Sequence, residues 1–545
     1  MAAPETTTPS QVVTGNDRSE KPEIDEHEHT SDKQAAASAI PVDLDDGKSI
    51  WQIVKENPRV IAYAVMANTG SLLFGYDILV TGACVALPAF SISFGSQFNG
   101  DLILPAKWQS LWTAFVQFGI MLGAFVNGFV QDKFGRRLAY ILGGTITAIG
   151  TVLAYTSADI ASLEGRRLAF FFSKIIIGTG MGMLMSACQT YVSEIAPPRL
   201  RGALLGFFAF CIGVGQMIAV TLVFTRVAII NTSAFKLPFA VAWGFSGLAI
   251  ITAFVIPESP TYLITKGKRA AAEKAYIRLH GSTADISAGL NILQSTIDHE
   301  RATAATTESA TYADCFKGTD ARRTWIIVLI TTMQHFLGVS LLSNANYFLI
   351  MAGMSPSKSL QITQIGIGLQ IACTYTSFFT MSLLGRRFLT LASTAAVGIV
   401  FLTMGVAGFY QRDTKALTYV GASLLLVGCI TALGLGSVWP VVANEVSSSR
   451  LRAKSSGIGF LVNAFGGGVF TIAVPYLFNA DAANLGAKIG FVFAGFCLLG
   501  FILVWFIIPE TKSKTYEELD YLFDIRAKTR AFKKPIDRAE FELRE

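Results

Sequence analysis

Apolar stretches of about 20 residues recur along the chain, and polar segments separate them. A helix of this length crosses a hydrocarbon core of about 30 Å. The stretches are centred near residues 73, 120, 147, 180, 213, 247, 338, 373, 399, 429, 466 and 498. The pattern therefore predicts an all-α membrane protein with twelve transmembrane helices.

Three polar segments divide the chain into five parts. Residues 1–58 are rich in small and acidic residues, which predicts a disordered cytosolic tail. Residues 258–322 contain the stretch KRAAAEKAYIRLHG and predict an intracellular helical linker between two six-helix bundles, at 59–257 and 323–509. Residues 510–545 are expected to form a cytosolic C-terminal tail.

Charged motifs of the first bundle return in the second bundle at a spacing of about 250 residues. The recurring pairs are the GRR triplets at 135–137 and 385–387, Glu194 and Glu445, Arg201 and Arg452, and the PE pairs at 257–258 and 509–510. This near-constant spacing indicates two related halves of six helices. In duplicated transporters the substrate binds between the halves at mid-depth.

The composition excludes a soluble protein. Hydrophobic residues make up 52% of the chain and charged residues 15%, whereas a soluble chain is about one quarter charged. The net charge of +6 comes from basic residues near the ends of the apolar stretches, so we expect no nucleic-acid partner. More of them flank the side with the tails and the linker, which predicts cytosolic termini. Arg166 and Arg167 lie on the opposite side, against this trend.

The sequence carries no motif for enzymatic chemistry or for metal binding. Its seven cysteines include no CxxC pair, and most lie in apolar stretches, which is typical of packing residues. His27 and His29 lie in the polar N-terminal segment with no second pair of ligands. There is no nucleophile–base arrangement and no phosphate-binding loop. We therefore expect no enzyme, no cofactor and no metal site.

Charged residues gather at the helix ends of the predicted cytosolic side. One interpretation is ordinary interfacial charge that water and headgroups satisfy. The other is a lock whose ion pairs hold the halves together in the outward-open state, and the duplicated pattern favours it. The residues of this predicted cytosolic gate are Asp132, Arg136, Arg137, Glu194, Arg201, Glu258, Arg386, Arg387, Glu445, Arg452 and Glu510.

Five motifs occur in order between the second apolar stretch and the C-terminal tail: DKFGRR, SEIAPPRLRG, PESPTYL, LGRR and PETKSKTYEELD. Together they resemble the sugar porter branch of the major facilitator superfamily. NYFLIMAGM and VPYLFNADAANLGAKIGFVFAG resemble fungal α-glucoside (maltose-type) permeases. The resemblance implies a rocker-switch carrier with twelve helices and a helical intracellular domain. The second half departs from the family pattern, because Ser382 stands where an acidic residue is expected.

Asp77 lies inside an apolar stretch, where an ionised carboxylate is costly unless it is paired or functional. Counting 1.5 Å per helical residue places Asp77 and Lys174 in the outer part of the membrane. Both match, by resemblance, the aspartate of FGYD and the fourth-span cation that pair in proton-coupled sugar porters, where the cation is usually Arg. The resemblance implies that they carry the coupled proton. The alternatives are a static buried ion pair, or a snorkelling Lys174 with Asp77 in a wet cavity.

Polar residues within the apolar stretches are candidates for sugar binding or, alternatively, for hydrogen bonds between helices. They are Gln216, Gln334, His335, Ser340, Asn344, Asn346 and Asn463. The resemblance implies sugar contacts for Gln216 and Gln334. His335, Ser340 and Ala209 stand where the family usually has two glutamines and an asparagine, and Trp439 is one residue from the usual tryptophan position, which Pro440 occupies. These changes predict a preference other than plain glucose.

We therefore predict a secondary active transporter that imports a sugar, such as an α-glucoside or another oligosaccharide, by proton symport with alternating access. The expected partners are the sugar, the proton and the lipid bilayer. We expect a monomer in the fungal plasma membrane with both termini cytosolic. The alternatives are a hexose uniporter, a sugar sensor without transport, or a transporter of a polyol, quinate or specialised metabolite. Asp77 and the cation at Lys174 argue against the uniporter.

Overall fold

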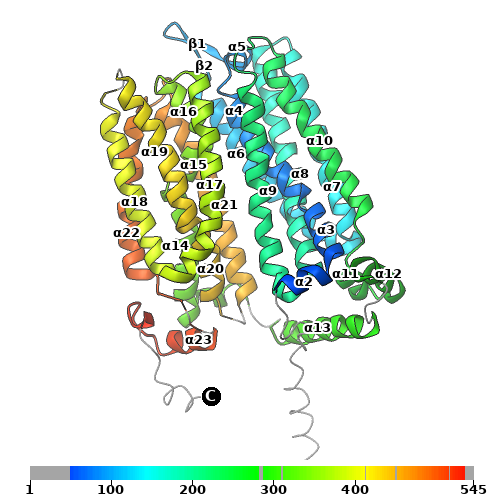
Figure 1. Cartoon of the computed structure of the whole chain (residues 1–545). Helices are drawn as coiled ribbons and strands as arrows, with labels where there is room; N and C mark the ends of the chain where they lie inside the picture. The colour runs from blue at the N-terminus through cyan, green and yellow to red at the C-terminus, as the bar shows by residue number, and fades with distance from the viewer. Residues whose placement is uncertain are drawn as a thin grey trace, which may run out of the picture. The chain divides into compact units, whose positions relative to one another are not determined.

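The computed structural model describes residues 50–281, 286–307, 311–410, 413–448, 451–512, 514 and 516–533. These residues lie within one compact unit, Lys48–Glu545. They form a bundle of long helices with a two-stranded hairpin at one end and short helices at the other (Figure 1). We name these ends the hairpin end and the linker end.

Several helices of the first half begin at a proline. Pro58, Pro88 and Pro198 stand at first helical positions, where the missing N–H group has no helical partner to lose. The helices are α2 (Ile50–Glu56), α3 (Pro58–Ala67), α4 (Thr69–Cys84), α5 (Pro88–Phe94), α6 (Ala106–Phe134), α7 (Arg136–Thr156), α8 (Leu163–Ile195), α9 (Pro198–Phe224) and α10 (Ser233–Val255), with the 3-10 turn η1 (Ser157–Asp159). Helix α2 lies inside the range predicted as a disordered tail.

The only strands among the described residues are β1 (Ser96–Phe98) and β2 (Asp101–Ile103), which pair antiparallel. Asn99 and Gly100 form the turn between them, and both have positive φ angles of 53° and 91°. An Asn-Gly turn of this kind matches the twist of a tight hairpin. The hairpin connects α5 to the start of α6 at the hairpin end (Figure 1).

The predicted linker contains α11 (Pro260–Thr265), α12 (Arg269–His280), α13 (Ile286–Thr307) and the turn η2 (Asp314–Phe316). These short helices share a small core of their own, in which Tyr262 and Leu263 of α11 pack against Ala272, Ala275 and Leu290. The segment that the sequence predicts as a linker thus contains three helices, and its place inside the cell stays a prediction.

The second half repeats the pattern of long helices. Its elements are α14 (Gly318–Phe336), α15 (Val339–Ser343), α16 (Ala345–Met351), α17 (Pro356–Leu384), α18 (Arg386–Ala407), α19 (Thr414–Leu433), α20 (Leu435–Val446), α21 (Arg452–Phe478), η3 (Gly486–Lys488), α22 (Ile489–Ile507), α23 (Tyr516–Asp524) and η4 (Ala531–Lys533). Gly338 breaks the seventh predicted span between α14 and α15, and its φ of 78° is a conformation that glycine adopts without strain.

Helix α23 shows that the C-terminal segment is partly ordered. Asp520 accepts a hydrogen bond from Arg323 at the start of α14, and Arg322 donates to the carbonyl of Ala527 at 2.7 Å. Phe523 packs beneath the Arg323 guanidinium at 4.4 Å. The segment predicted as a tail from residue 510 therefore docks on the second half through α23.

Among the described residues, nine helices are long and apolar enough to cross a membrane, and ten if the bent pair Pro58–Cys84 and Pro88–Phe94 is one span. The seventh and eighth predicted spans correspond to α14–α16 and α17. Each predicted centre thus falls on a helix or, near residue 338, on the break within one. The prediction of an all-α membrane protein with this order of helices is confirmed.

Small residues let the helices approach closely. A Cβ atom added at Gly75 of α4 would lie 2.1 Å from the Ile212 carbonyl oxygen of α9, and one at Gly123 of α6 would lie 1.9 Å from that of Thr179 in α8. Inside lipid the hydrophobic effect does not drive helices together, so the van der Waals attraction at such close contacts holds them instead. The halves touch each other where α6 packs on α21, α9 on α17 and α4 on α16.

Candidate functional site

A cluster of charged groups closes the linker end of the first half. Arg136 forms an ion pair with Glu194, with 2.5 Å between Nη2 and Oε1. The Glu258 carboxylate accepts the backbone N–H groups of Arg136 and Arg137 at 2.9 and 3.3 Å. Gly135 makes this possible with a φ of 95°, and a Cβ atom there would lie 2.6 Å from a Glu258 oxygen.

The second half repeats the cluster with the same geometry. Arg386 pairs with Glu445 at 2.9 Å, and Glu510 accepts the backbone N–H groups of Arg386 and Arg387 at 2.9 and 3.2 Å. Gly385 has a φ of 83°, and a Cβ atom there would lie 2.7 Å from a Glu510 oxygen. The repeated motifs in the sequence therefore encode one structural unit used twice.

Both clusters join helices of one half, so in this structure they do not bridge the halves. Asp132 and Arg201 are exposed, and the side chain of Arg452 lies outside the described part of the chain. The predicted lock concerns the outward-open state, and it stays a prediction. The contacts observed here instead fasten the linker ends of the helices within each half.

At the hairpin end, three side chains of the second half bond to the backbone of the first half around the start of α6. Tyr347 accepts the backbone N–H of Leu104 at 3.0 Å, Asn479 donates to the Leu104 carbonyl at 2.8 Å, and Asp481 accepts the N–H of Ala106 at 3.0 Å. These bonds hold the segment that leads into α6. We name Tyr347, Asn479 and Asp481 the latch.

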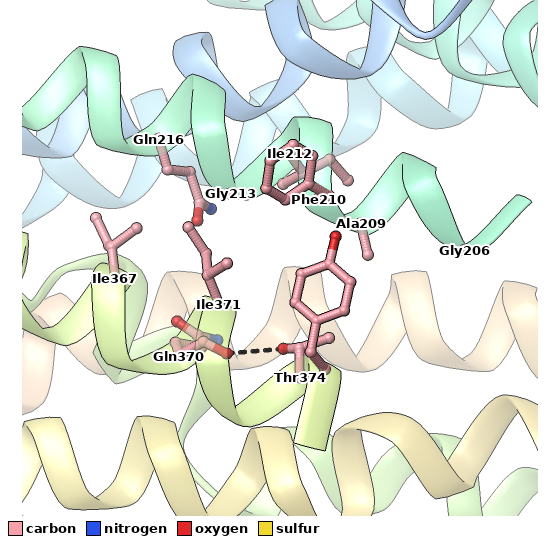
Figure 2. A pocket seen from close by; sticks show the side chains of 11 residues that line it. Gly206, Ala209, Phe210, Ile212, Gly213, Gln216, Ile367, Gln370, Ile371 and Thr374 are labelled. Carbon is pink, nitrogen blue, oxygen red and sulfur yellow. Dashed lines mark hydrogen bonds between the residues drawn. The ribbon is translucent and has the colours of Figure 1, made fainter. Parts of the chain in front are cut away.

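A cavity of about 210 Å³ lies between α9 of the first half and α17 of the second half (Figure 2). Gln216 projects into it from α9, and Gln370 lies across it on α17 (Figure 2). Phe210 and Tyr375 meet edge to face across the two halves, with ring centroids 5.9 Å apart. The remaining lining residues are Gly206, Ala209, Ile212, Gly213, Ile367, Ile371 and Thr374.

Of the residues predicted to bind substrate, only Gln216 lines this cavity. The others lie elsewhere in the second half, and most of them bond or pack there. His335 bonds to the Asn463 carbonyl at 2.8 Å, and the Asn463 amide donates to the Thr331 carbonyl at 3.1 Å. Gln334 is half-buried, and Trp439 packs edge-on against Phe460. Ser340 accepts a hydrogen bond from Thr471 at 3.5 Å, and Asn344 donates to the Ser340 carbonyl at 3.0 Å. Asn346 bonds to Thr363 at 2.6 Å.

Gln370, Thr374 and Tyr375 were not among the sequence candidates. A signal for them exists, because Gln370 and Thr374 are four residues apart within a predicted span and so share one helix face. The Thr374 hydroxyl donates its hydrogen to the Gln370 carbonyl at 2.8 Å and keeps its capacity to accept (Figure 2).

Asp77 and Lys174 are both buried, on α4 and α8, and they form no direct ion pair. Lys174 donates to the Thr81 hydroxyl at 2.7 Å and lies over the rings of Phe170 and Phe239 at 4.9 and 5.1 Å. The Asp77 Oδ2 atom is buried and has no hydrogen-bond partner in the described part of the chain. Lys174 therefore bonds to Thr81, one helical turn beyond Asp77, and not to the Asp77 carboxylate that the sequence suggests as its partner.

A second, smaller cavity of about 10 Å³ connects this region with the latch. Thr81, Asn344 and the latch residue Tyr347 line it together with Gln109, whose side-chain oxygen is buried without a described partner. The remaining lining residues are Gly82, Val85, Trp112 and Thr113. The volume suits about one water molecule.

The two arginines at the hairpin end have a structural role. Arg167 donates to the Phe94 carbonyl at 2.9 Å and Arg166 donates to the Ser93 carbonyl at 3.3 Å. These carbonyls end the short helix α5, where cations are stabilised by the helix dipole. Their position against the charge trend is thus explained by capping.

Within the described ranges, no group of three His, Cys, Asp or Glu side chains is placed to hold a metal ion.

Comparison with known protein families gives a match that spans most of the chain. The sequence profile of the family described as "Sugar (and other) transporter" matches residues 63–523. The MFS transporter fmqE of Aspergillus fumigatus is 31% identical over 526 residues, which cover 94% of this chain and 96% of that protein. The general alpha-glucoside permease of Saccharomyces cerevisiae is 27% identical over 537 residues, which cover 97% of this chain and 85% of that protein.

Solved structures confirm the fold. The xylose transporter XylE from E. coli, in its inward open conformation, matches with a TM-score of 0.70 at 21% identity, covering 85% of this chain and 99% of that chain. A second XylE structure, described as a proton:xylose symporter bound to 6-bromo-6-deoxy-D-glucose, matches with a TM-score of 0.65 at 22% identity, covering 86% of this chain and 99% of that chain. At this identity the likeness concerns the fold alone.

Proposed function

This chain belongs to the sugar (and other) transporter family of the major facilitator superfamily, and from this premise we propose that it is a proton-coupled importer of α-glucosides. It is a multi-pass membrane protein of a transporter family, not an enzyme. We propose that it works as a monomer in the fungal plasma membrane, with the linker end and both termini in the cytosol. The names of the Saccharomyces and Aspergillus relatives support a fungal carrier, and the former supports an α-glucoside.

The buried carboxylate of Asp77, whose Oδ2 atom has no hydrogen-bond partner in the described part of the chain, is the observation that carries the proposal. A charge buried without a partner is costly, and protonation removes that cost. Lys174 meanwhile bonds to Thr81 and not to Asp77. This geometry supports a proton-loaded carrier, in which a proton neutralises the carboxylate and the cation bonds to another acceptor.

The latch and the cavity supply the rest of an alternating-access cycle. The latch bonds join the halves at the hairpin end, which in our orientation faces outside. Gly206, on the rim of the cavity, lies about 12 Å along α9 from its start at Pro198. The cavity therefore extends from the middle of the bundle toward the linker end. A solute held by α9 and α17 contacts both halves, as a rocker-switch requires.

A carrier cycle follows from these parts. With the hairpin end open, ionised Asp77 accepts a proton from outside. Lys174 then turns to Thr81, the latch closes on Leu104, and the solute faces the linker end. Release of solute and proton to the cytosol returns Asp77 to its ionised form. Gln216 and Gln370, one from each half, bind sugar hydroxyls during the crossing.

The test is uptake of labelled maltose and related α-glucosides by transporter-deficient yeast with the external pH recorded. We expect alkalinisation that appears with the sugar and disappears in Asp77→Asn, while exchange of sugar persists. Asp101→Asn, which alters an exposed carboxylate of the hairpin, is the matched control and should behave as wild type. Uphill accumulation that survives in Asp77→Asn would refute proton coupling through this residue.

Three alternatives lead to different results in the same assay. A hexose uniporter would give saturable entry of hexose with no change of external pH. A carrier of a polyol, quinate or specialised metabolite would take up no α-glucoside. The sensor alternative predicts no uptake of any solute.

A further inference from the structure

The cavity between α9 and α17 has two chemically different parts. Its polar part consists of the amides of Gln216 and Gln370. Its other walls are apolar, because Phe210, Ile367 and Ile371 line it alongside the ring of Tyr375. We infer that the carried solute is an α-glucoside whose aglycone is an aromatic ring, with the glucosyl group on the amides and the aglycone against the Phe210–Tyr375 wall. This inference rests on the proposed function.

The number of available hydrogen-bond groups argues against a free disaccharide. A disaccharide carries hydroxyl groups on both rings, and each loses its water on entering the cavity. A hydroxyl that finds no partner there is unfavourable. The Thr374 hydroxyl donates its hydrogen to the Gln370 carbonyl and can still accept one, so the side-chain partners on the described lining are the amides of Gln216 and Gln370 and the hydroxyls of Thr374 and Tyr375. These groups suffice for one sugar ring.

The polar groups of the neighbouring helices do not make up the difference. His335 and Asn463 bond to each other's segment across α14 and α21. Asn344 donates its amide to the Ser340 carbonyl of its own segment. Trp439, whose ring is large enough to offer a second stacking surface, packs edge-on against Phe460. None of these side chains lines the cavity.

The aromatic wall has the geometry that binds a ring. Phe210 and Tyr375 stand at 61° to each other, so an inserted ring can pack face-on against one and edge-on against the other, which are both favoured arrangements. The two residues come from different halves, so an aromatic aglycone would contact both. Tyr375 is 45% exposed, which means that its ring is not needed for the core.

The experiment compares para-nitrophenyl α-glucoside with maltose, since the two share the glucosyl group and differ in the second ring. We expect a KM about tenfold lower for the aryl glucoside, equivalent to ~1.4 kcal/mol. Phe210→Ala and Tyr375→Ala should each remove most of this preference, because they raise the KM for the aryl glucoside more than the KM for maltose. Phe254→Ala, which removes an exposed ring of α10, is the matched control and should retain the preference.

Each remaining outcome overturns a defined part of the proposal. If maltose has the same or a lower KM and the two variants affect both sugars equally, the aromatic aglycone is wrong and the proposed function stands. If neither α-glucoside enters with a proton, the proposed function and this inference both fail. Surface staining of tagged protein distinguishes lost transport from lost expression, and Phe210→Leu, which keeps an apolar side chain without the ring, repeats the test if the alanine variant is not displayed.

Discussion

The Lys174 ammonium donates a hydrogen bond of 2.7 Å to the Thr81 hydroxyl, although an aspartate lies one helical turn away on the same helix as that threonine. The two rings beneath the ammonium, those of Phe170 and Phe239, hold it in this position by cation–π contacts. The lysine thus has a polar partner that does not titrate. In the proposed cycle it alternates between this hydroxyl and the Asp77 carboxylate.

Thr81→Val should slow the cycle by removing that hydroxyl. A hydrogen bond to a charged group contributes about 1.5–3 kcal/mol, so we expect initial uptake to fall about tenfold or more. Thr81→Ser keeps the hydroxyl and should restore uptake. The measurement is the initial rate of uptake at several external pH values. Equal rates for Thr81→Val and wild type would show that the bond has no role in transport.

Weakening the latch should shift the population toward the state that is open at the hairpin end. Asp481→Asn weakens a charge-assisted bond to the Ala106 N–H and should destabilise the closed state by about 1 kcal/mol, roughly a fivefold change in population. A Thr113→Cys reporter lines the small cavity behind the latch, so impermeant maleimide should label it faster in this variant. Asp101→Asn is the control. Unchanged labelling would contradict a gating role for Asp481.

The paired glycines at the linker end should be intolerant of a side chain. Gly135 and Gly385 have φ angles of 95° and 83°, and a Cβ atom would meet a glutamate oxygen in each case. Alanine at either position should destabilise the protein by about 1–3 kcal/mol and lower the melting temperature in detergent. A Cβ atom added at Gly128 would meet no other atom within 4 Å, so Gly128→Ala serves as control. A similar melting temperature in all three variants would contradict the structural role.

The helices and the duplicated clusters could be predicted from the sequence because their signals are local. An apolar stretch of sufficient length becomes a membrane helix wherever it packs. The charge motifs likewise recur within short segments, as at Arg136 and Arg386. What these motifs contact was harder to predict, because Glu194 and Glu445 lie far along the chain. The sequence indicated a pairing, and the structure places each pair within one half.

The side chains that line the cavity were harder to predict for a physical reason. A polar residue inside a span either lines the path or bonds to a neighbouring helix, and the rotation of the helix about its axis decides which. That rotation depends on packing between residues far apart in the sequence. His335 and Asn463 therefore read as substrate contacts, and in the structure they bond across α14 and α21. Gln370 had the same kind of signal and lines the cavity.

Gln370→Leu and Gln334→Ala separate the cavity of the structure from the site implied by family resemblance. If the cavity between α9 and α17 binds the solute, Gln370→Leu removes one of its two amides and should raise KM about tenfold, since one hydrogen bond to a buried hydroxyl contributes about 1 kcal/mol and an unpaired hydroxyl adds to the loss. Gln334 does not line that cavity, so Gln334→Ala should change KM less than about twofold. The measurement is the concentration dependence of uptake, corrected for the amount of protein at the surface. The opposite order of effects would place the sugar on α14 and remove the cavity from the binding step.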